Sequence, residues 1–359
     1  MNFDFADVLM EVLERRASDL HIAAGAPPTI RIRGRLVALE DYPRLTPSDT
    51  REIVYSILGN DQRQRLETDL QVDLAYAIPG RARFRVNAYF QRGAIGAAFR
   101  LIPANIAGID ELGLPPIVHE LTKKPRGFVL CTGPTGSGKS TSLAAMINEI
   151  NETREEHIMT VEDPIEFLHQ HKKCLVNQRE LGSDAITFTD ALRAALRQDP
   201  DVILVGEMRD LETISTALTA AETGHLVFAT LHTQDTPQTI DRIIDVFPPH
   251  QQHQVRVQLS VALQGIITQT LLPTADGAGR CLAAEVLVPT PAIRNLIREG
   301  KTHQIYSVLQ TSASAGMQTM DSSLANLVRT GRITRQLAEQ RSTTPDELRR
   351  LLGATPMAA

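Results

Sequence analysis

The nonapeptide at residues 133–141 reads Gly133-Pro134-Thr135-Gly136-Ser137-Gly138-Lys139-Ser140-Thr141. It fits the P-loop pattern G-x-x-x-x-G-K-[ST], in which backbone N–H groups and a helix N-terminus hold phosphate oxygens. The apolar run at 128–131 predicts a buried strand, and the helical pattern at 140–150 completes the context that the motif requires. An ordinary strand–helix connection is disfavoured by the full motif. We therefore expect a nucleotide site, with Lys139 at the β- and γ-phosphates and Ser140 on Mg²⁺.

Composition limits the class of protein. The chain has 359 residues, of which 42% are hydrophobic and 22% charged, as in a globular protein of two or three domains. A net charge of -5 and an aromatic content of 4% without Trp disfavour a general nucleic-acid binder. Neither a signal peptide nor a membrane-spanning stretch is expected, because the N-terminus lacks a basic region and no run of about twenty apolar residues occurs.

Three separated cysteines, Cys131, Cys174 and Cys281, contain no CxxC pair, which indicates a reducing compartment and no zinc module. His169, His171 and Cys174 lie close in sequence, so a metal site is conceivable there. A polar surface segment is the favoured interpretation, because no fourth ligand is evident.

The first hundred residues predict a small α+β domain over 1–102 with a mainly antiparallel sheet. An amphipathic helix is expected at 5–16, and the pattern then changes to the two-residue period of strands. The strand-like runs lie at 30–37, 72–76, 83–90 and 94–102.

The rest of the chain predicts a parallel α/β domain over 117–359, after a Pro- and Gly-rich linker at 103–116. Strands are expected at 127–131, 157–161, 175–177, 202–205 and 226–230, and helices at 140–150, 189–197, 210–223 and 236–246. A long helix is then predicted from about 251 to 272, a strand or hairpin at 280–288, and wholly helical structure from about 291.

Two arginines of the first domain are expected to lie opposite each other on neighbouring strands. If Arg92 and Gly93 form a two-residue hairpin turn, Arg85 lies opposite Arg100 on one face of the sheet. Like charges in that position are destabilising, so an anion is expected nearby. Both side chains being simply solvated is the plainer alternative. The stronger interpretation is a pair of arginine fingers directed at a nucleotide phosphate.

An apolar strand at 202–205 ends in Gly206-Glu207, which resembles a Walker B strand with Gly206 in place of the usual Asp. Glu207 is therefore expected beside the γ-phosphate, where it would orient water. The alternative is a solvated acid at a strand end. Without the usual Asp, Mg²⁺ would be held mainly by Ser140, phosphates and water.

Two further strand ends carry polar groups. Glu162 and Asp163 follow the strand at 157–161, and His232 follows the strand at 226–230. Because carboxyl ends of parallel strands meet at one edge of the sheet, these groups are expected near the P-loop. The acids could position water or Mg²⁺, or they could simply belong to a charged loop. His232 could sense the γ-phosphate, or it could be a structural histidine.

These motifs together resemble the secretion ATPase superfamily of type II and type IV secretion and of type IV pilus motors. The matching segments are 18–22, 160–167, 197–210 and 224–233. Segments 172–180, 292–299 and 316–321 are similar to the pilus retraction (PilT-type) branch of that superfamily. The segment 181–185 departs from the stretch usual in that branch, and the longer N-terminal region and four-cysteine element of extension and secretion ATPases are not found.

The resemblance implies an N-terminal PAS-like domain and a RecA-like ATPase domain, assembled as a homo-hexamer with ATP bound between the domains. It implies that Glu207 is the catalytic glutamate, that Glu162 is the acid of the family's Asp box, and that Arg85 and Arg100 contact phosphates. His232 belongs to its His box. ATP and Mg²⁺ would be the cofactors. The motor would be cytoplasmic and peripheral at the inner face of the cytoplasmic membrane, where it would turn an inner-membrane platform protein that depolymerises pilin.

Four alternatives stay open at this point. A pilus assembly or type II secretion ATPase is disfavoured by segment 292–299 and the missing cysteine pairs. An accessory retraction ATPase of the PilU type is separated only weakly. A DNA translocase is disfavoured by net acidity and scarce aromatics, so no direct contact with nucleic acid is expected. A scaffold that binds nucleotide without hydrolysis is disfavoured by the presence of Lys139, Ser140 and Glu207.

Overall fold

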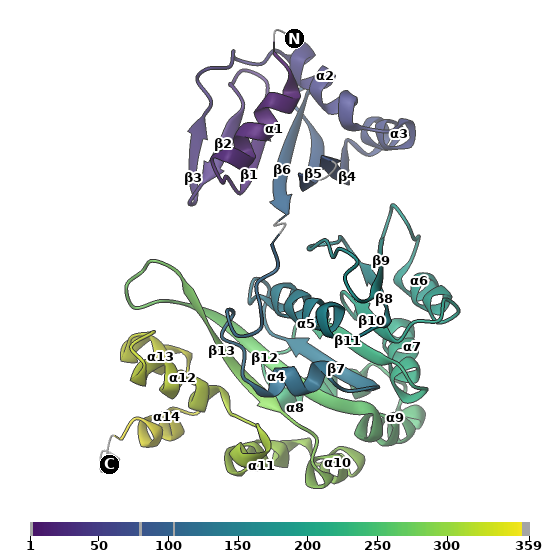
Figure 1. Ribbon diagram of the computed structural model, residues 1–359, viewed down its shortest axis with the longest axis vertical. Helices are drawn as coiled ribbons and strands as arrows, with labels where there is room; N and C mark the ends of the chain where they lie inside the picture. Colours follow the sequence, from purple (N-terminus) through teal and green to yellow (C-terminus); the bar gives the residue numbers. More distant parts are fainter. Residues whose placement is uncertain (1–2, 79–80, 103–104, 354–359) are drawn as a thin grey trace. The chain divides into compact units, whose positions relative to one another are not determined.

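The computed structural model describes residues 3–78, 81–102 and 105–353. The chain divides into two compact units, Met1–Asn105 and Ile106–Ala359, each with its own sheet and apolar core (Figure 1). Residues 103 and 104, at the start of the predicted linker, lie outside the described residues. Later in that stretch, Ile109 and Leu114 are buried in an apolar cluster of the second unit. Within the described residues, no helix is both long and apolar enough to cross a membrane.

The first unit is an α+β fold with one six-stranded sheet in the order β3-β2-β1-β6-β5-β4, and every neighbouring pair is antiparallel. Its strands are β1 (Asp19–Ile22), β2 (Thr29–Ile32), β3 (Arg35–Ala38), β4 (Gln71–Ile78), β5 (Ala82–Gln91) and β6 (Ala94–Ile102). Its helices are α1 (Phe5–Glu14), α2 (Pro47–Ile57) and α3 (Asn60–Asp69). Burial alternates along β5, where Phe84, Val86 and Ala88 enter the core, so one face of the sheet is apolar and the other polar.

The turn between β5 and β6 determines which residues face each other on the polar side. Arg92 and Gly93 have φ values of 51° and 77°, the two positive values that a two-residue hairpin turn needs. The resulting register places Arg85 opposite Arg100, as the sequence predicts. The alignment of these two arginines therefore follows from local turn geometry.

The second unit has a seven-stranded sheet in the order β13-β12-β7-β11-β10-β8-β9, with helices on both faces (Figure 1). Its strands are β7 (Gly127–Thr132), β8 (His157–Glu162), β9 (Leu175–Glu180), β10 (Val202–Val205), β11 (Leu226–Leu231), β12 (Leu263–Pro273) and β13 (Arg280–Leu287). Neighbouring strands are parallel except for β13, which is antiparallel to β12. From residue 127 to residue 231, strands and helices follow one another along the chain in the predicted sequence.

The first helix of this unit precedes the parallel strands, the next five connect them along the chain, and the last five form a C-terminal group. In chain order, the helices are α4 (Ile117–Thr122), α5 (Lys139–Thr153), α6 (Phe188–Ala195), α7 (Leu211–Glu222), α8 (Thr236–Asp245), α9 (Pro249–Ala262), α10 (Pro291–Arg298), α11 (Ile305–Thr311), α12 (Met320–Arg329), α13 (Arg335–Arg341) and α14 (Pro345–Leu351). The helical region predicted from about 291 is confirmed.

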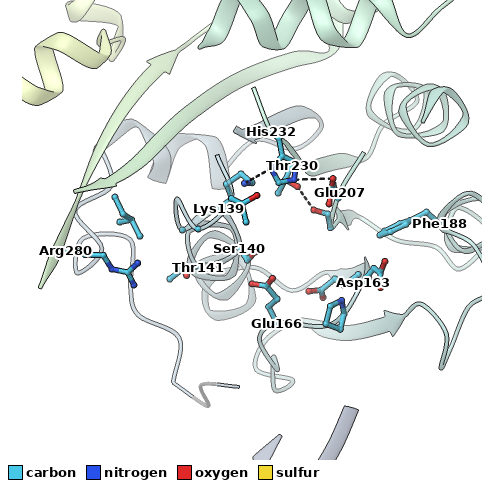
Figure 2. Close-up of a pocket in the computed structure, with 17 residues that line it drawn as sticks. Lys139, Ser140, Thr141, Asp163, Glu166, Phe188, Glu207, Thr230, His232 and Arg280 are labelled. Atoms are coloured by element: carbon cyan, nitrogen blue, oxygen red, sulfur yellow. Dashed lines mark hydrogen bonds and ion pairs between the residues drawn. The ribbon is translucent and has the colours of Figure 1, made fainter. Parts of the chain in front are cut away.

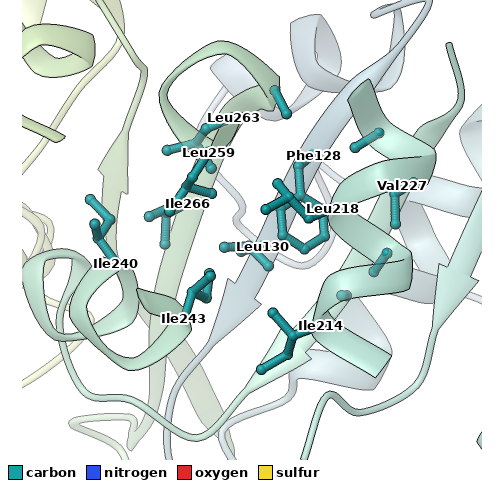
Figure 3. Close-up of a cluster of buried hydrophobic side chains, with 14 of the residues drawn as sticks. Phe128, Leu130, Ile214, Leu218, Val227, Ile240, Ile243, Leu259, Leu263 and Ile266 are labelled. Atoms are coloured by element: carbon teal, nitrogen blue, oxygen red, sulfur yellow. The ribbon is translucent and has the colours of Figure 1, made fainter. Parts of the chain in front are cut away.

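Alternate residues of β7 pack on opposite faces of the sheet. Phe128 and Leu130 contact the cluster formed with α7, α8 and α9 (Figure 3), whereas Val129 and Cys131 contact the cluster on the α5 side. A strand covered on both faces reads as a continuous apolar run, which is the pattern seen before the P-loop. This double cover places the P-loop at the edge of a rigid layer.

The helix predicted from about 251 to 272 is wrong in its second half. Helix α9 ends at Ala262, and β12 begins at Leu263 and inserts beside β7. The residues at 263–268 include Ile266, Ile267 and Thr268, which are β-branched and buried. An apolar run without alternation does not distinguish a strand covered on both faces from a buried helix.

Candidate functional site

The P-loop connects β7 to α5 with its lysine turned inward. Gly133, Gly136 and Gly138 all have positive φ, which lets the chain turn tightly around the loop. Lys139 begins α5 with an exposed fraction of 8%, and its Nζ donates to the carbonyl oxygens of Gly133 at 2.9 Å and Pro134 at 3.1 Å. Burial lowers the pKa of this ammonium. The lysine is thus held by two carbonyl oxygens of its own loop.

A cavity of about 390 Å³ opens over the loop at the carboxyl ends of the parallel strands (Figure 2). Its lining combines the loop with the polar strand ends: Thr135, Gly136, Gly138, Lys139, Ser140, Thr141, Glu162, Asp163, Pro164, Glu166, Phe188, Gly206, Glu207, Thr230, His232, Leu271 and Arg280. The structure therefore brings together the loop and the acids and histidine that the sequence places at strand ends. Ligands of parallel α/β sheets bind at this edge.

Glu207 lies between two basic side chains. Its Oε2 accepts a hydrogen bond from Arg209 Nη2 at 2.8 Å, and its Oε1 is 3.2 Å from His232 Nε2. The bond from Arg209, with the charges of Arg209 and His232, outweighs burial and lowers the pKa of the carboxyl. His232 Nδ1 is in turn 3.4 Å from Lys139 Nζ. The carboxylate is therefore ionised at neutral pH. His232 lies between it and the P-loop lysine and contacts both.

Glu162 is the more buried acid of the site, with an exposed fraction of 9%. Burial raises its pKa, although it accepts hydrogen bonds from Thr160 Oγ1 at 2.7 Å and Gln178 Nε2 at 3.2 Å. Gly206 packs against it, since a Cβ added there would lie 3.2 Å from the Glu162 Cα. This close approach of β10 to the end of β8 gives a physical reason for glycine where an Asp is usual.

Arg85 and Arg100 lie in the first unit, on the polar face of its sheet. Arg100 Nε donates to Asp19 Oδ1 at 3.0 Å. Burial opposes ionisation of Asp19, but bonds from Ser18 and Arg100 outweigh it and lower the pKa of this carboxyl. Asp19 thus provides an anion for Arg100 within the chain, and the sequence interpretation missed it. The roles of Arg85 and Arg100 toward a phosphate stay predictions.

Three residues that line the cavity were missed by the sequence interpretation. Leu271 comes from β12. Arg280, at the start of β13, and Phe188, the first residue of α6, are labelled in Figure 2. Arg280 was within the predicted strand at 280–288, but nothing local shows that this strand lies two places from the P-loop strand. That neighbourhood arises only when β12 pairs with β7.

The segment with His169, His171 and Cys174 is tied to backbone groups. The Cys174 thiol contacts the carbonyl oxygens of Ile150 and Arg154, and His171 Nδ1 accepts the N–H of Val176 at 3.0 Å. Burial lowers the pKa of His169 to about 4. No group of three or more His, Cys, Asp or Glu among the residues that the structure describes could hold a metal ion.

Comparison with known proteins agrees with this geometry. A type IV pilus retraction ATPase, PilT, of Pseudomonas aeruginosa is 51% identical over 96% of this chain and 99% of the relative. A type IV pilus ATPase, PilU, of the same organism is 42% identical over 97% of this chain and 91% of the relative. A crystal structure of the pilus retraction motor PilT with bound ADP matches with a TM-score of 0.92 and 53% identity, over 97% of this chain and 100% of the other.

A family model described as type II/IV secretion system protein matches residues 3–340. The predicted fold class is confirmed: a PAS-like α+β domain is followed by a RecA-like P-loop domain with a helical C-terminal region. Because the family model and the PilT relative each cover nearly the whole chain, this protein belongs to the type II/IV secretion system protein family.

Proposed function

We propose that this chain is an ATP-hydrolysing motor that drives retraction of type IV pili. The observation that carries the ATPase part is the position of the ionised Glu207, held by Arg209 and linked through His232 to the P-loop Lys139. A carboxylate at this place can accept a proton from water as the water attacks the γ-phosphorus. The bond from that phosphorus to the β,γ-bridging oxygen then breaks, and phosphate and ADP are released.

Other residues of the cavity support binding. Lys139 would exchange the carbonyls of Gly133 and Pro134 for phosphate oxygens, which are stronger partners because they are charged. The Ser140 hydroxyl and nearby carboxylates line the same cavity, so the donor set fits the oxygen preference of Mg²⁺. Mg²⁺ bound there would neutralise charge on the transferred phosphoryl group.

Assembly is part of the proposal. We infer that the chain works as a homo-hexamer and that Arg85 and Arg100 contact a nucleotide phosphate, so that closure around the ligand depends on the γ-phosphate. The support is the pairing of these arginines on one exposed face and the family membership. A mass measurement with and without ATP tests the hexamer, and a strictly monomeric chain in both conditions contradicts it.

Retraction is proposed because the relative at 51% identity is a pilus retraction ATPase and the matching solved structure is a retraction motor. The chain would act on a platform protein in the cytoplasmic membrane and stay peripheral on its cytoplasmic side. An accessory role remains the alternative with specific support, since the PilU relative is 42% identical over nearly the same span.

Phosphate release by the purified chain tests the ATPase step. Glu207→Gln should bind ATP yet hydrolyse it more slowly by at least about 100-fold, the contribution expected of a positioned base. Lys139→Ala should lose binding. Glu212→Gln, which changes an exposed carboxylate on α7, is the matched control and should hydrolyse normally. Hydrolysis by Glu207→Gln at the wild-type rate would overturn the assignment.

Surface pili counted in cells test the direction of the motor. Cells lacking the gene and cells producing Lys139→Ala should both carry excess pili that do not retract. Bald cells would indicate an assembly ATPase instead. A normal pilus count with weakened twitching would favour the accessory role.

A further inference from the structure

Gln269 is a buried polar residue of β12 that contacts the P-loop. Its exposed fraction is 1%. The side-chain Nε2 donates to the carbonyl oxygen of Ser137 at 2.8 Å, and Oε1 accepts a hydrogen bond from the Cys131 thiol at 3.1 Å. Its backbone also borders the loop, because a Cβ added at Gly133 would lie 2.3 Å from the Gln269 carbonyl oxygen. One residue of β12 therefore contacts the first and fifth residues of the loop and the strand before it.

The bond to Ser137 determines the direction of the next N–H group. Because a trans peptide is planar, the Ser137 carbonyl and the Gly138 N–H point in opposite directions. Gly138 has a φ of +90° and lines the cavity beside Lys139. A carbonyl drawn toward β12 therefore turns the Gly138 N–H away from β12.

The strand that carries Gln269 is itself anchored on its far side. Gln269 pairs with Ala284 of β13, whose carbonyl accepts Gln318 Nε2 at 2.6 Å and whose N–H donates to Ser323 Oγ at 3.1 Å. The Gln269 amide thus lies on the β12–β13 hairpin, which the C-terminal region holds through hydrogen bonds with Gln318 and Ser323. Precise orientation of a loop requires such support from rigid elements.

We propose that Gln269 is a positioning residue for the nucleotide phosphates. Its amide holds the Ser137–Gly138 peptide so that the Gly138 N–H faces a bound phosphate. The inference rests on the proposed ATP-binding function of the same cavity. An apolar side chain of equal size would fill the same space beside Ser137 and Cys131, but it would leave the Ser137 carbonyl without this donor.

Two substitutions separate the donor from the volume. Gln269→Met fills the space without a donor. Gln269→Glu keeps the shape, and only its protonated form can donate to Ser137. Burial should raise the pKa of that new carboxyl, so the donor is present in acid and lost in alkali.

Equilibrium binding of a fluorescent ATP analogue to the full chain with Mg²⁺ measures the effect between about pH 6 and about pH 8.5, the range in which a buried carboxyl titrates. Gln269→Met should bind about tenfold more weakly, which corresponds to about 1.4 kcal/mol. Gln269→Glu should bind like wild type at the acid end and lose about tenfold as the pH rises. Cys131 of β7 contacts Gln269, Arg280 of β13 lines one cavity with it, and Lys139 of α5 interacts with Cys131. Wild type is therefore titrated in parallel to account for these groups.

Thr268→Val is the matched control, because Thr268 is the neighbour of Gln269 on β12. The substitution removes the buried contact, 2.7 Å long, between the Oγ1 atoms of Thr268 and Thr132. It should lower the melting temperature and leave affinity within about twofold. Wild-type affinity in Gln269→Met, an equal loss in Thr268→Val, or a pH-independent loss in Gln269→Glu would each overturn the inference. A wild-type chain that binds no analogue would overturn the proposed function, and this inference with it.

Discussion

Replacing Arg294 with Met should destabilise the second unit, because this side chain completes the end of α9. Its guanidinium donates to the carbonyl oxygens of Ser260, Val261 and Leu263, with distances of 2.8 Å to Val261 and 3.1 Å to Leu263. The last carbonyls of a helix have no partner within the helix, and the negative end of its dipole attracts a cation. Arg294 therefore links α10 to the junction at which α9 ends and β12 begins.

The magnitude follows from the bonds that are lost. A hydrogen bond from a charged group contributes about 1.5–3 kcal/mol, and water can replace part of it where the carbonyls are exposed. We therefore expect the free energy of unfolding to fall by about 2–3 kcal/mol. For a unit of this size each kcal/mol corresponds to about 2–4 °C, so the melting temperature should fall by about 4–12 °C.

Thermal melting of the full chain without nucleotide measures this change. Arg298→Met is the matched control, since Arg298 lies on the same helix, is exposed and bonds only to the Asn295 side chain among its described hydrogen-bond partners. Arg294→Lys should recover part of the loss, because one ammonium cannot reproduce the planar fork. Equal melting of the Met variants at 294 and 298, or full recovery by Lys, would refute the reasoning.

Two further predictions concern pH. Arg209→Ala should raise the pKa of Glu207, because Arg209 is the main cause of its lowering; the acid limb of the ATP-hydrolysis profile should then move to higher pH, and an unmoved limb would count against Glu207 as the base. Glu149 and Asp110 raise the pKa of His119 above its ordinary value of 6.5. The stabilisation from this cluster is therefore complete below that value and is lost as pH rises through the folded-state pKa. The melting difference between wild type and His119→Gln should narrow with rising pH, and a constant difference would contradict the charged cluster.

Some of the site could be predicted because its determinants are local. The loop with Lys139 and Ser140 is contiguous, and its chemistry depends on its own glycines and on the helix that follows. The register of Arg85 against Arg100 depends only on the turn between them. Glu207 and His232 could be placed together because parallel strands present their carboxyl ends at one edge.

The errors and omissions come from contacts between distant segments. The apolar run beginning at Leu263 has no alternation, because β12 is covered on both faces, so its pattern fits a buried helix equally well. A helix over this stretch leaves Gln269 and Arg280 far from the P-loop, whereas the pairing of β12 with β7 brings both near it. Asp19 was missed for a similar reason, since its contact with Arg100 requires β1 to pair with β6 across most of the first unit.

The residues of the loop and of the strand ends could thus be identified along the chain, whereas their arrangement in space could not. Glycine spacing, a lysine and strand-end acids carry their meaning within a few residues, since dihedral preferences and alternation are local properties. The insertion of β12 beside β7 and the contact of the Gln269 amide with the P-loop arise from packing between segments more than a hundred residues apart. Which strands become neighbours depends on the burial of whole faces, and only the tertiary structure expresses that.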